Sequence, residues 1–166
     1  MNKQEFYREL NRDLRALVDG ETSFLALMSN CSALLYERLE QVNWAGFYLL
    51  SEKDTLVLGP FQGKLACVRI PIDRGVCGAA ITEKTIQRVG DVHTFVGHIA
   101  CDAASNAEIV LPLTLNNEVV GILDIDSIAY NRFDDGDEAG LKILSEWLSE
   151  ALAATDLYQF LQINRR

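Results

Sequence analysis

The stretch EIVLPLTLNNEVVGILDID, residues 108–126, decides the fold class of this chain. It predicts two strands, 108–115 and 118–126, because both runs are rich in valine, isoleucine and leucine. Asn116 and Asn117 between them suit a two-residue hairpin turn, since asparagine tolerates positive φ. The second strand is apolar on both faces, which is typical of a strand covered on both sides near the centre of a sheet. The stretch therefore predicts a sheet built around an antiparallel hairpin.

The segments on either side of this hairpin supply the rest of one domain. Apolar residues at helical spacing, Leu17 among them, predict a helix over residues 2–18, and Thr22 or Ser23 can cap a second helix. The remaining predicted elements are strands at 44–50, 54–59, 65–70 and 85–89, a short helix after a turn at Gly75 and Cys77, and a closing helix from Asp134 or Asp135 to about Tyr158. Together they predict an α+β fold over residues 1–166, with a central antiparallel sheet of about six strands flanked by N-terminal and C-terminal helices.

The acidic charge balance, a net charge of −9, speaks against a nucleic-acid or anionic-membrane partner, since both need a basic face. The amphipathic N-terminus MNKQEFYREL is not typical of a signal peptide, and no apolar run approaches the roughly 20 residues of a membrane span. We therefore expect a cytoplasmic protein. Four cysteines in such a chain point to catalysis, redox exchange, metal binding or plain burial more than to a structural disulfide framework.

Asp124 and Asp126 are an anomaly at the end of the second strand. Strand side chains alternate, so both aspartates lie on one face, about 7 Å apart, next to the apolar row that holds Val120 and Ile122. Mutual repulsion and partial burial should raise the pKa of at least one carboxyl, which would make it a candidate acid. The same pair could hold an ammonium group. The alternative is a structural role, in which the carboxylates cap the strand end and accept from backbone amides at Ser127 and beyond.

Glu108 cannot be placed from the pattern alone. A plain two-residue turn pairs it with Ile125, on the face opposite to the two aspartates. A bulge near Pro112, which cannot donate to a strand ladder, would shift the register by one and bring Glu108 to their face. Alternatively, Glu108 belongs to the loop before the strand.

Cys101 is the strongest candidate nucleophile. It belongs to a connection, residues 91–107, that shows no regular pattern, and so long a connection in a compact domain is usually functional or disordered. No apolar periodicity surrounds Cys101, so its thiol is expected to be available for reaction. Acidic surroundings raise the pKa of a thiol unless backbone amides or a positive substrate offset them. The alternatives are an idle loop cysteine and a zinc site with His93 and His98, which lacks a recognised spacing and a clear fourth ligand.

The other three cysteines differ in what their surroundings predict. Cys31 lies in the apolar stripe of the second helix, so we expect it to fill the core as a small hydrophobe. Cys67, in a predicted strand, and Cys77, at the start of a short helix, are equally compatible with burial and with reactivity.

Four motifs carry a resemblance to a known family: WAGFYLL (44–50), LVLGPFQGKLACVRIPIDRGVCG (56–78), VHTFVGHIACDAASNAEIVLPL (92–113) and GILDIDS (121–127). Together they resemble the free methionine-(R)-sulfoxide reductase family, whose members are single GAF domains, and the similarity runs over nearly the whole chain. The resemblance implies reduction of free L-methionine (R)-sulfoxide to methionine, with no cofactor and no metal. A GAF fold alone would not imply this, since most GAF domains are ligand sensors.

The cysteines of the chain match those of the family in their sequence contexts. Cys101 resembles the catalytic cysteine and Cys67 the resolving cysteine, while Cys77 matches a third cysteine that can also form a disulfide with Cys101. The implied reaction takes Cys101 through a sulfenic acid to an intramolecular disulfide, which thioredoxin would reduce. A homodimer through the terminal helices is compatible with the family but not required by this sequence.

The binding residues also follow from the matched motifs. Glu108, Asp124 and Asp126 match the acidic residues that bind and protonate the substrate, and Trp44 and Tyr48 resemble aromatic residues that line the pocket for the substrate methyl group. Two other functions compete with this one: a non-catalytic GAF module that binds a small ligand, and a thiol protein that senses metal or peroxide.

Overall fold

The computed structural model describes residues 1–99 and 104–165, and over these residues it forms one six-stranded sheet with helices on both faces. The elements are α1 (Lys3–Val18), α2 (Phe24–Arg38), β1 (Val42–Glu52), β2 (Thr55–Gly63), β3 (Arg69–Pro71), α3 (Gly75–Glu83), β4 (Gln87–Val89), the 3-10 turn η1 (Val92–Thr94), β5 (Ala107–Leu115), β6 (Glu118–Ser127), α4 (Asp135–Ala153) and α5 (Leu157–Asn164). The strand order is β3-β2-β1-β6-β5-β4, and all neighbours are antiparallel. The predicted α+β class with an antiparallel sheet is therefore confirmed.

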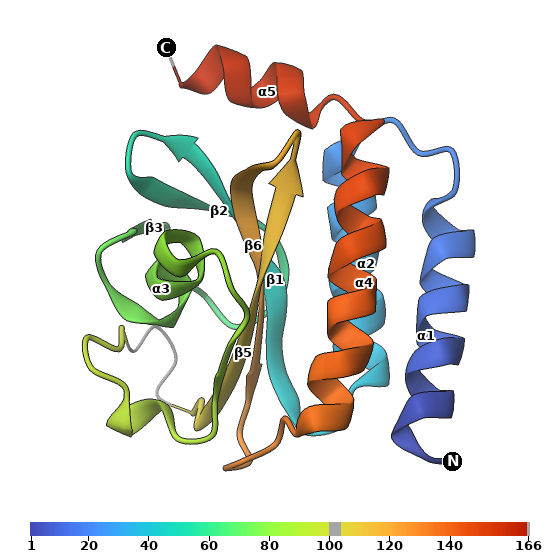
Figure 1. The fold of residues 1–166 in the computed structure, drawn as a ribbon, viewed down its shortest axis with the longest axis vertical. Helices are drawn as coiled ribbons and strands as arrows, with labels where there is room; N and C mark the ends of the chain where they lie inside the picture. The colour runs from blue at the N-terminus through green and yellow to red at the C-terminus, as the bar shows by residue number, and fades with distance from the viewer. Residues whose placement is uncertain (100–103, 166) are drawn as a thin grey trace.

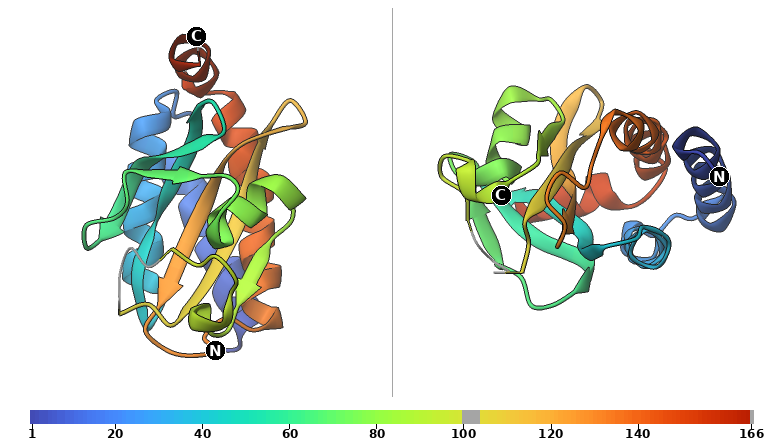
Figure 2. Two further views of the ribbon diagram at one scale, coloured as in Figure 1. Left: turned by 90° about the vertical axis from the view of Figure 1, so that its left-hand side faces the viewer. Right: turned by 90° about the horizontal axis from the view of Figure 1, so that it is seen from below.

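The sheet separates two apolar clusters. Helices α1, α2 and α4 cover one face, whereas α3 and η1 lie on the other (Figures 1 and 2). The larger cluster fills the space under α1, α2 and α4 and includes Cys31, which is fully buried there as predicted. The smaller cluster lies between the sheet and α3 and includes Trp44, Tyr48 and Cys77. The chemically interesting residues thus belong to the α3 side.

The hairpin between β5 and β6 has the predicted turn and a shifted register. Asn116 and Asn117 have φ of 51° and 64°, as a two-residue hairpin requires. Leu113 pairs with Gly121 but Thr114 pairs with Val119, so Val120 is an extra residue in β6. Beyond this bulge each residue of β5 faces a partner one position further along β6 than a plain turn would give.

The bulge decides which side chains share a face. Glu108 now lies opposite Asp126, and Val110 lies opposite Asp124. Residues directly opposite in an antiparallel pair point to the same side of the sheet. The alternative in which a register shift brings Glu108 to the face of the aspartates is therefore confirmed. The shift lies between Leu113 and Thr114 of β5, just after Pro112. The prediction that Val120 shares a face with the aspartates was wrong, because this residue packs in the cluster under α1, α2 and α4.

The structure differs from the prediction in the strand expected at residues 65–70 and in the inward face of the first helix. The predicted strand at 65–70 is reduced to β3, and Cys67 lies in an irregular segment before it. Two backbone carbonyls at this segment accept hydrogen bonds from side chains of β1: Trp44 Nε1 donates to Lys64 O, and Tyr48 Oη donates to Cys67 O. In α1, Leu17 is 52% exposed because Val18 takes the inward position at the end of the helix.

The closing helix is interrupted where one long helix was predicted. It ends as α4 at Ala153, and α5 begins at Leu157. At the break, Asp156 N donates to Thr22 O and the Asp156 carboxylate accepts from Phe24 N. These bonds tie the break to the start of α2, which satisfies backbone groups at both helix ends.

Helices α1 and α4 pack closely together at Gly140 of α4. A Cβ atom at this position would overlap the ring of Tyr7 in α1, whose hydroxyl donates to Asp137 Oδ1 at 2.6 Å. We expect Gly140→Ala to lower the free energy of unfolding by about 1–3 kcal/mol, because the backbones must separate. Gly136→Ala in the same helix is the matched control, since its Cβ would meet only the flexible Lys3 side chain and the Asp134 carboxylate at 3.2–3.3 Å. Equal stability of the two variants in urea denaturation would contradict this reading.

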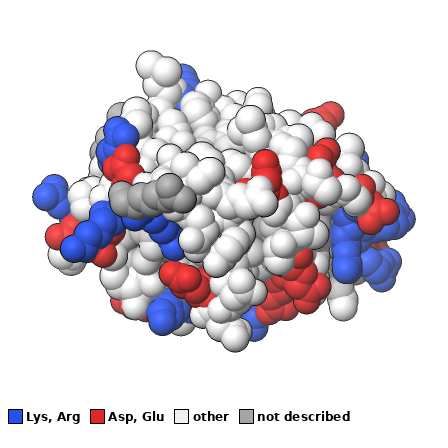
Figure 3. Space-filling view, turned by 90° about the horizontal axis from the view of Figure 1, so that it is seen from above, with Lys and Arg blue, Asp and Glu red and all other residues white. Residues whose placement is uncertain are grey.

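The surface that carries α5 has mixed charge. Its middle is mostly uncharged, with acidic and basic side chains around the edge (Figure 3). None of the helices that the structure describes combines the length and the apolarity that a bilayer span requires.

Candidate active site

A cavity lies on the α3 side of the sheet, where β1, β5 and β6 face the first turn of α3. Its empty space, including the open solvent at its mouth, is about 570 Å³. The residues that line it are Trp44, Tyr48, Leu65, Ala66, Ile70, Gly75, Val76, Cys77, Val92, His98, Ile99, Ser105, Glu108, Asp124 and Asp126. All three predicted acidic residues and both predicted aromatic residues therefore meet at one cavity.

The carboxyl groups of Glu108, Asp124 and Asp126 crowd together at the floor of this cavity. Glu108 and Asp124 are only 7% and 5% exposed, and Asp126 is half-buried. The described residues that line the cavity include no lysine or arginine, and Asp124 Oδ1 has no hydrogen-bond partner among the residues that the structure describes. Burial raises the pKa of Asp124 well above its ordinary value, and the negative charges of Asp126 and Glu108 raise it further. The floor can thus hold a proton or receive a cation.

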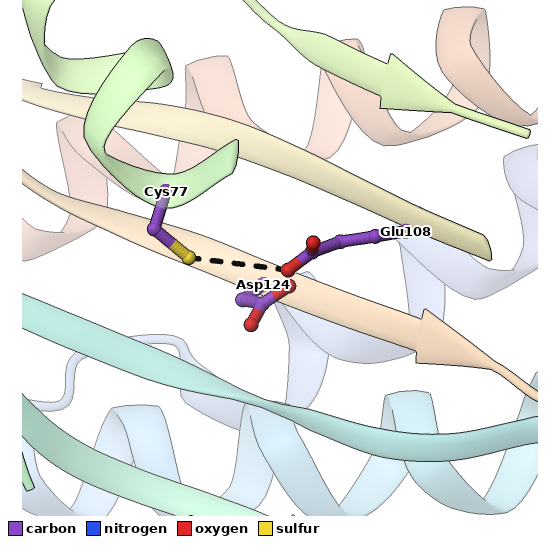
Figure 4. Close-up of side chains that lie close together, drawn as sticks. All are labelled: Cys77, Glu108 and Asp124. Atoms are coloured by element: carbon purple, nitrogen blue, oxygen red, sulfur yellow. Dashed lines mark hydrogen bonds between the residues drawn. The ribbon is translucent and has the colours of Figure 1, made fainter. Parts of the chain in front are cut away.

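Cys77 brings a thiol to the same place from the first turn of α3. Its S–H donates to Glu108 Oε2 at 3.9 Å, and Asp124 points toward the same point (Figure 4). Donor atoms of these three residues all lie within 4.8 Å of one another. Burial, together with the neighbouring carboxylates, raises the pKa of Cys77 well above its ordinary value. The expected place of Cys77 at the start of the short helix is confirmed, although the helix begins already at Gly75, so the predicted turn at Gly75 and Cys77 is the first turn of α3.

The remaining cysteines are in different states. Cys67 is half-buried in the segment between β2 and β3, and it is disulfide-bonded. Cys31 and Cys77 are free thiols, and burial in the other cluster raises the pKa of Cys31. Cys101, the predicted nucleophile, lies outside the described residues. The alternative zinc site with His93 and His98 includes Cys101, so it also extends outside them. His93 Nε2 is 3.0 Å from Asn106 Oδ1, while His98 lines the cavity.

An aromatic stack forms one wall of the cavity. Trp44 stacks on Tyr48 with ring centroids 5.9 Å apart, and Phe61 of β2 stacks on the other side of Trp44 at 5.2 Å. The indole is also held by the bond from its Nε1 to Lys64 O. Phe61 was missed from the sequence, although its pairing with Gly46 in β1 leaves room for this stack. Trp44 and Tyr48 thus give the cavity a rigid apolar wall beside its carboxyl groups, since Trp44 pairs with Asp126 across β1 and β6.

Comparison with known proteins identifies close relatives over nearly the full length. A family model described as a GAF domain matches residues 26–153. The chain is 64% identical over 160 residues to the free methionine-R-sulfoxide reductase of Escherichia coli K12, which covers 96% of each chain. It is similar to the structure of the fRMsr of Staphylococcus aureus in complex with substrate, with 48% identity and a TM-score of 0.84 over 89% of this chain and 95% of that one. It is also similar to the free methionine-R-sulfoxide reductase of Neisseria meningitidis in complex with its substrate, with 41% identity and a TM-score of 0.87 over 93% of this chain and 92% of that one.

Proposed function

Because this chain belongs to the free methionine-R-sulfoxide reductase family of GAF domains, we propose that it reduces free L-methionine (R)-sulfoxide to L-methionine through Cys101. We take residues 1–166 as one such domain. The observation that carries the proposal is the floor of the cavity, where three carboxyl groups converge without a lysine or arginine among the described lining residues. Such a floor suits a substrate that brings both an ammonium group and an oxygen atom that needs a proton.

The two sides of the cavity divide the recognition of the substrate. The ammonium group would pair with the carboxylates of Glu108, Asp124 and Asp126 that remain ionised. The S-methyl group would lie against Trp44 and Tyr48. Because the two rings are already stacked on each other, they offer apolar area and lose little side-chain conformational entropy on binding. A methionine within a protein has no free ammonium group, so this arrangement favours the free amino acid.

The chemistry begins at Cys101. Its thiolate attacks the sulfoxide sulfur, and a protonated carboxyl among the three acidic residues gives its proton to the sulfoxide oxygen. The raised pKa of Asp124 supports this residue as that acid. The oxygen ends on the cysteine as a sulfenic acid, the substrate sulfur gains two electrons, and methionine leaves.

A second thiol completes the turnover. Cys67 attacks the sulfenic acid of Cys101, a disulfide forms and water leaves. The disulfide-bonded state of Cys67 in this structure supports its role as the resolving cysteine, and Cys77 is the alternative thiol for this step. An external dithiol, for which we propose thioredoxin, then restores both thiols by exchange. Pairing of two chains through the terminal helices also belongs to the proposal.

The test is consumption of four sulfoxides by the full chain, with dithiothreitol as reductant. We expect multiple turnovers with free methionine (R)-sulfoxide and none above background with the S epimer. N-acetylmethionine (R)-sulfoxide and the R-sulfoxide in a peptide are the matched controls, because both keep the sulfoxide and lack the ammonium group. Equal rates with the free and the acetylated R epimer would overturn the proposed role of the carboxyl floor.

A further inference from the structure

The thiol of Cys77 is not needed to recognise an ammonium group, yet it points at the same carboxyl groups. The substrate cation would be satisfied by oxygen atoms alone, whereas here a sulfur atom lies 3.9 Å from Glu108 Oε2. Asp124 is 5% exposed and turned toward both residues, and its Oδ1 has no hydrogen-bond partner within the described part of the chain (Figure 4). A buried carboxylate oxygen left open in this way costs free energy until a proton or a cation meets it.

We propose that Cys77, Glu108 and Asp124 form a binding site for a thiophilic divalent cation, with Zn²⁺ as its ligand, and that the occupied site blocks the cavity. One sulfur and two carboxylate oxygens suit Zn²⁺, whereas Mg²⁺ and Ca²⁺ take oxygen ligands only. The ion would replace the protons that the three groups otherwise share, and solvent in the cavity would supply the fourth ligand.

The geometry of the three donor atoms is close to what the ion requires. Tetrahedral Zn²⁺ with bonds of about 2.0–2.3 Å holds its donor atoms roughly 3.5 Å apart. The three atoms here lie within 4.8 Å of one another, and the sulfur–oxygen pair of Cys77 and Glu108 is 3.9 Å apart. Small rotations of side chains on α3, β5 and β6 would close the remaining gap. The site is therefore assembled by the fold from three elements and not by neighbours in one loop.

The charge of the site favours the binding of a divalent cation. Asp126 lines the same cavity and adds a third carboxyl group, while no lysine or arginine is present among the described lining residues. A bound ion would occupy the place proposed above for the substrate ammonium group and would tie up the Cys77 thiol. This inhibitory consequence rests on the proposed function, whereas the binding of the ion does not.

The experiment measures binding directly, with Co²⁺ as a spectroscopic probe and Zn²⁺ as competitor. The reduced full chain should take up one equivalent of Co²⁺ with a near-ultraviolet thiolate-to-metal absorption band, which Zn²⁺ removes. Cys77→Ser should lose the band and bind Zn²⁺ at least about tenfold more weakly in calorimetry, and Glu108→Gln should weaken binding by a similar factor. Cys31→Ala, which changes a buried thiol on the other face of the sheet, should bind like the wild type.

A double variant separates this site from the other thiols. Cys67→Ser/Cys101→Ser keeps Cys77 and should retain the band, whether or not it reduces any sulfoxide. Retention of the band in Cys77→Ser would overturn the site, and so would its loss in Cys67→Ser/Cys101→Ser. Because the absorption readout needs no turnover, failure of the metal site and failure of the proposed reductase activity are distinguishable.

Discussion

Replacement of Cys101 by serine is expected to lower the reduction of free methionine (R)-sulfoxide by about 10⁴-fold or more, to the background rate. A hydroxyl is far less ionised and less nucleophilic than a thiol at neutral pH, so the first covalent step has no replacement. Steady-state assays with dithiothreitol at high enzyme concentration measure the residual rate. Binding of the substrate should change little, because the carboxyl floor and the aromatic wall are intact.

The control for this variant is Cys31→Ala. Cys31 is a fully buried thiol on the opposite face of the sheet, so its removal leaves the cavity unchanged and turnover should persist. Full multiple-turnover activity in Cys101→Ser would end the assignment of the nucleophile and favour a different thiol, of which Cys77 is the nearest to the carboxyl groups among those described.

Replacement of Asp124 by asparagine is expected to move activity and stability in opposite directions. The amide keeps the shape of the side chain but cannot deliver an acidic proton or hold an ammonium group as an ion pair, so kcat/KM should fall by about 10²–10⁴-fold. The free energy of unfolding at pH 7 should rise by about 1–3 kcal/mol, because the substitution removes a negative charge that is buried beside the carboxyl groups of Asp126 and Glu108. Kinetics with the R epimer and urea denaturation check the two effects.

The pH dependence of that stability difference has a definite sign. The pKa of Asp124 is raised in the folded state, so the wild type loses stability relative to Asp124→Asn at pH values above the unfolded pKa of about 3.9. The difference should disappear as the pH falls below about 4, where the carboxyl is protonated in both states. Asp126→Asn, at a half-buried position, should show a smaller change in stability. Wild-type kcat/KM in Asp124→Asn would contradict a catalytic role for this carboxyl.

The sequence was sufficient for the features that depend on local pattern. The Asn116-Asn117 hairpin, the burial of Cys31 and the shared face of Asp124 and Asp126 all follow from turn chemistry or from side-chain alternation, and the structure confirms them. These features need no knowledge of how distant segments meet.

Features that depend on a single bulged residue, or on a hydrogen bond between distant segments, could not be predicted from the sequence. The side of the sheet that Glu108 faces depends on the extra residue Val120, and a bulge leaves no distinct mark in an apolar run. In the irregular segment before β3, the carbonyl of Cys67 accepts a hydrogen bond from Tyr48 Oη, a contact between segments that local pattern does not specify. The convergence of Cys77 on Glu108 likewise requires α3 to be placed over β5, which periodicity alone does not specify.

The most direct test of the central claim is the intact mass of a variant that cannot resolve its sulfenic acid. Cys67→Ser/Cys77→Ser, given one equivalent of free methionine (R)-sulfoxide without reductant, should release about one methionine per chain and then stop. Its mass should rise by one oxygen atom, and a sulfenic-acid trap should locate that atom on Cys101. An unchanged mass after methionine has formed, or an oxygen atom trapped on a residue other than Cys101, would contradict transfer of the sulfoxide oxygen to this cysteine.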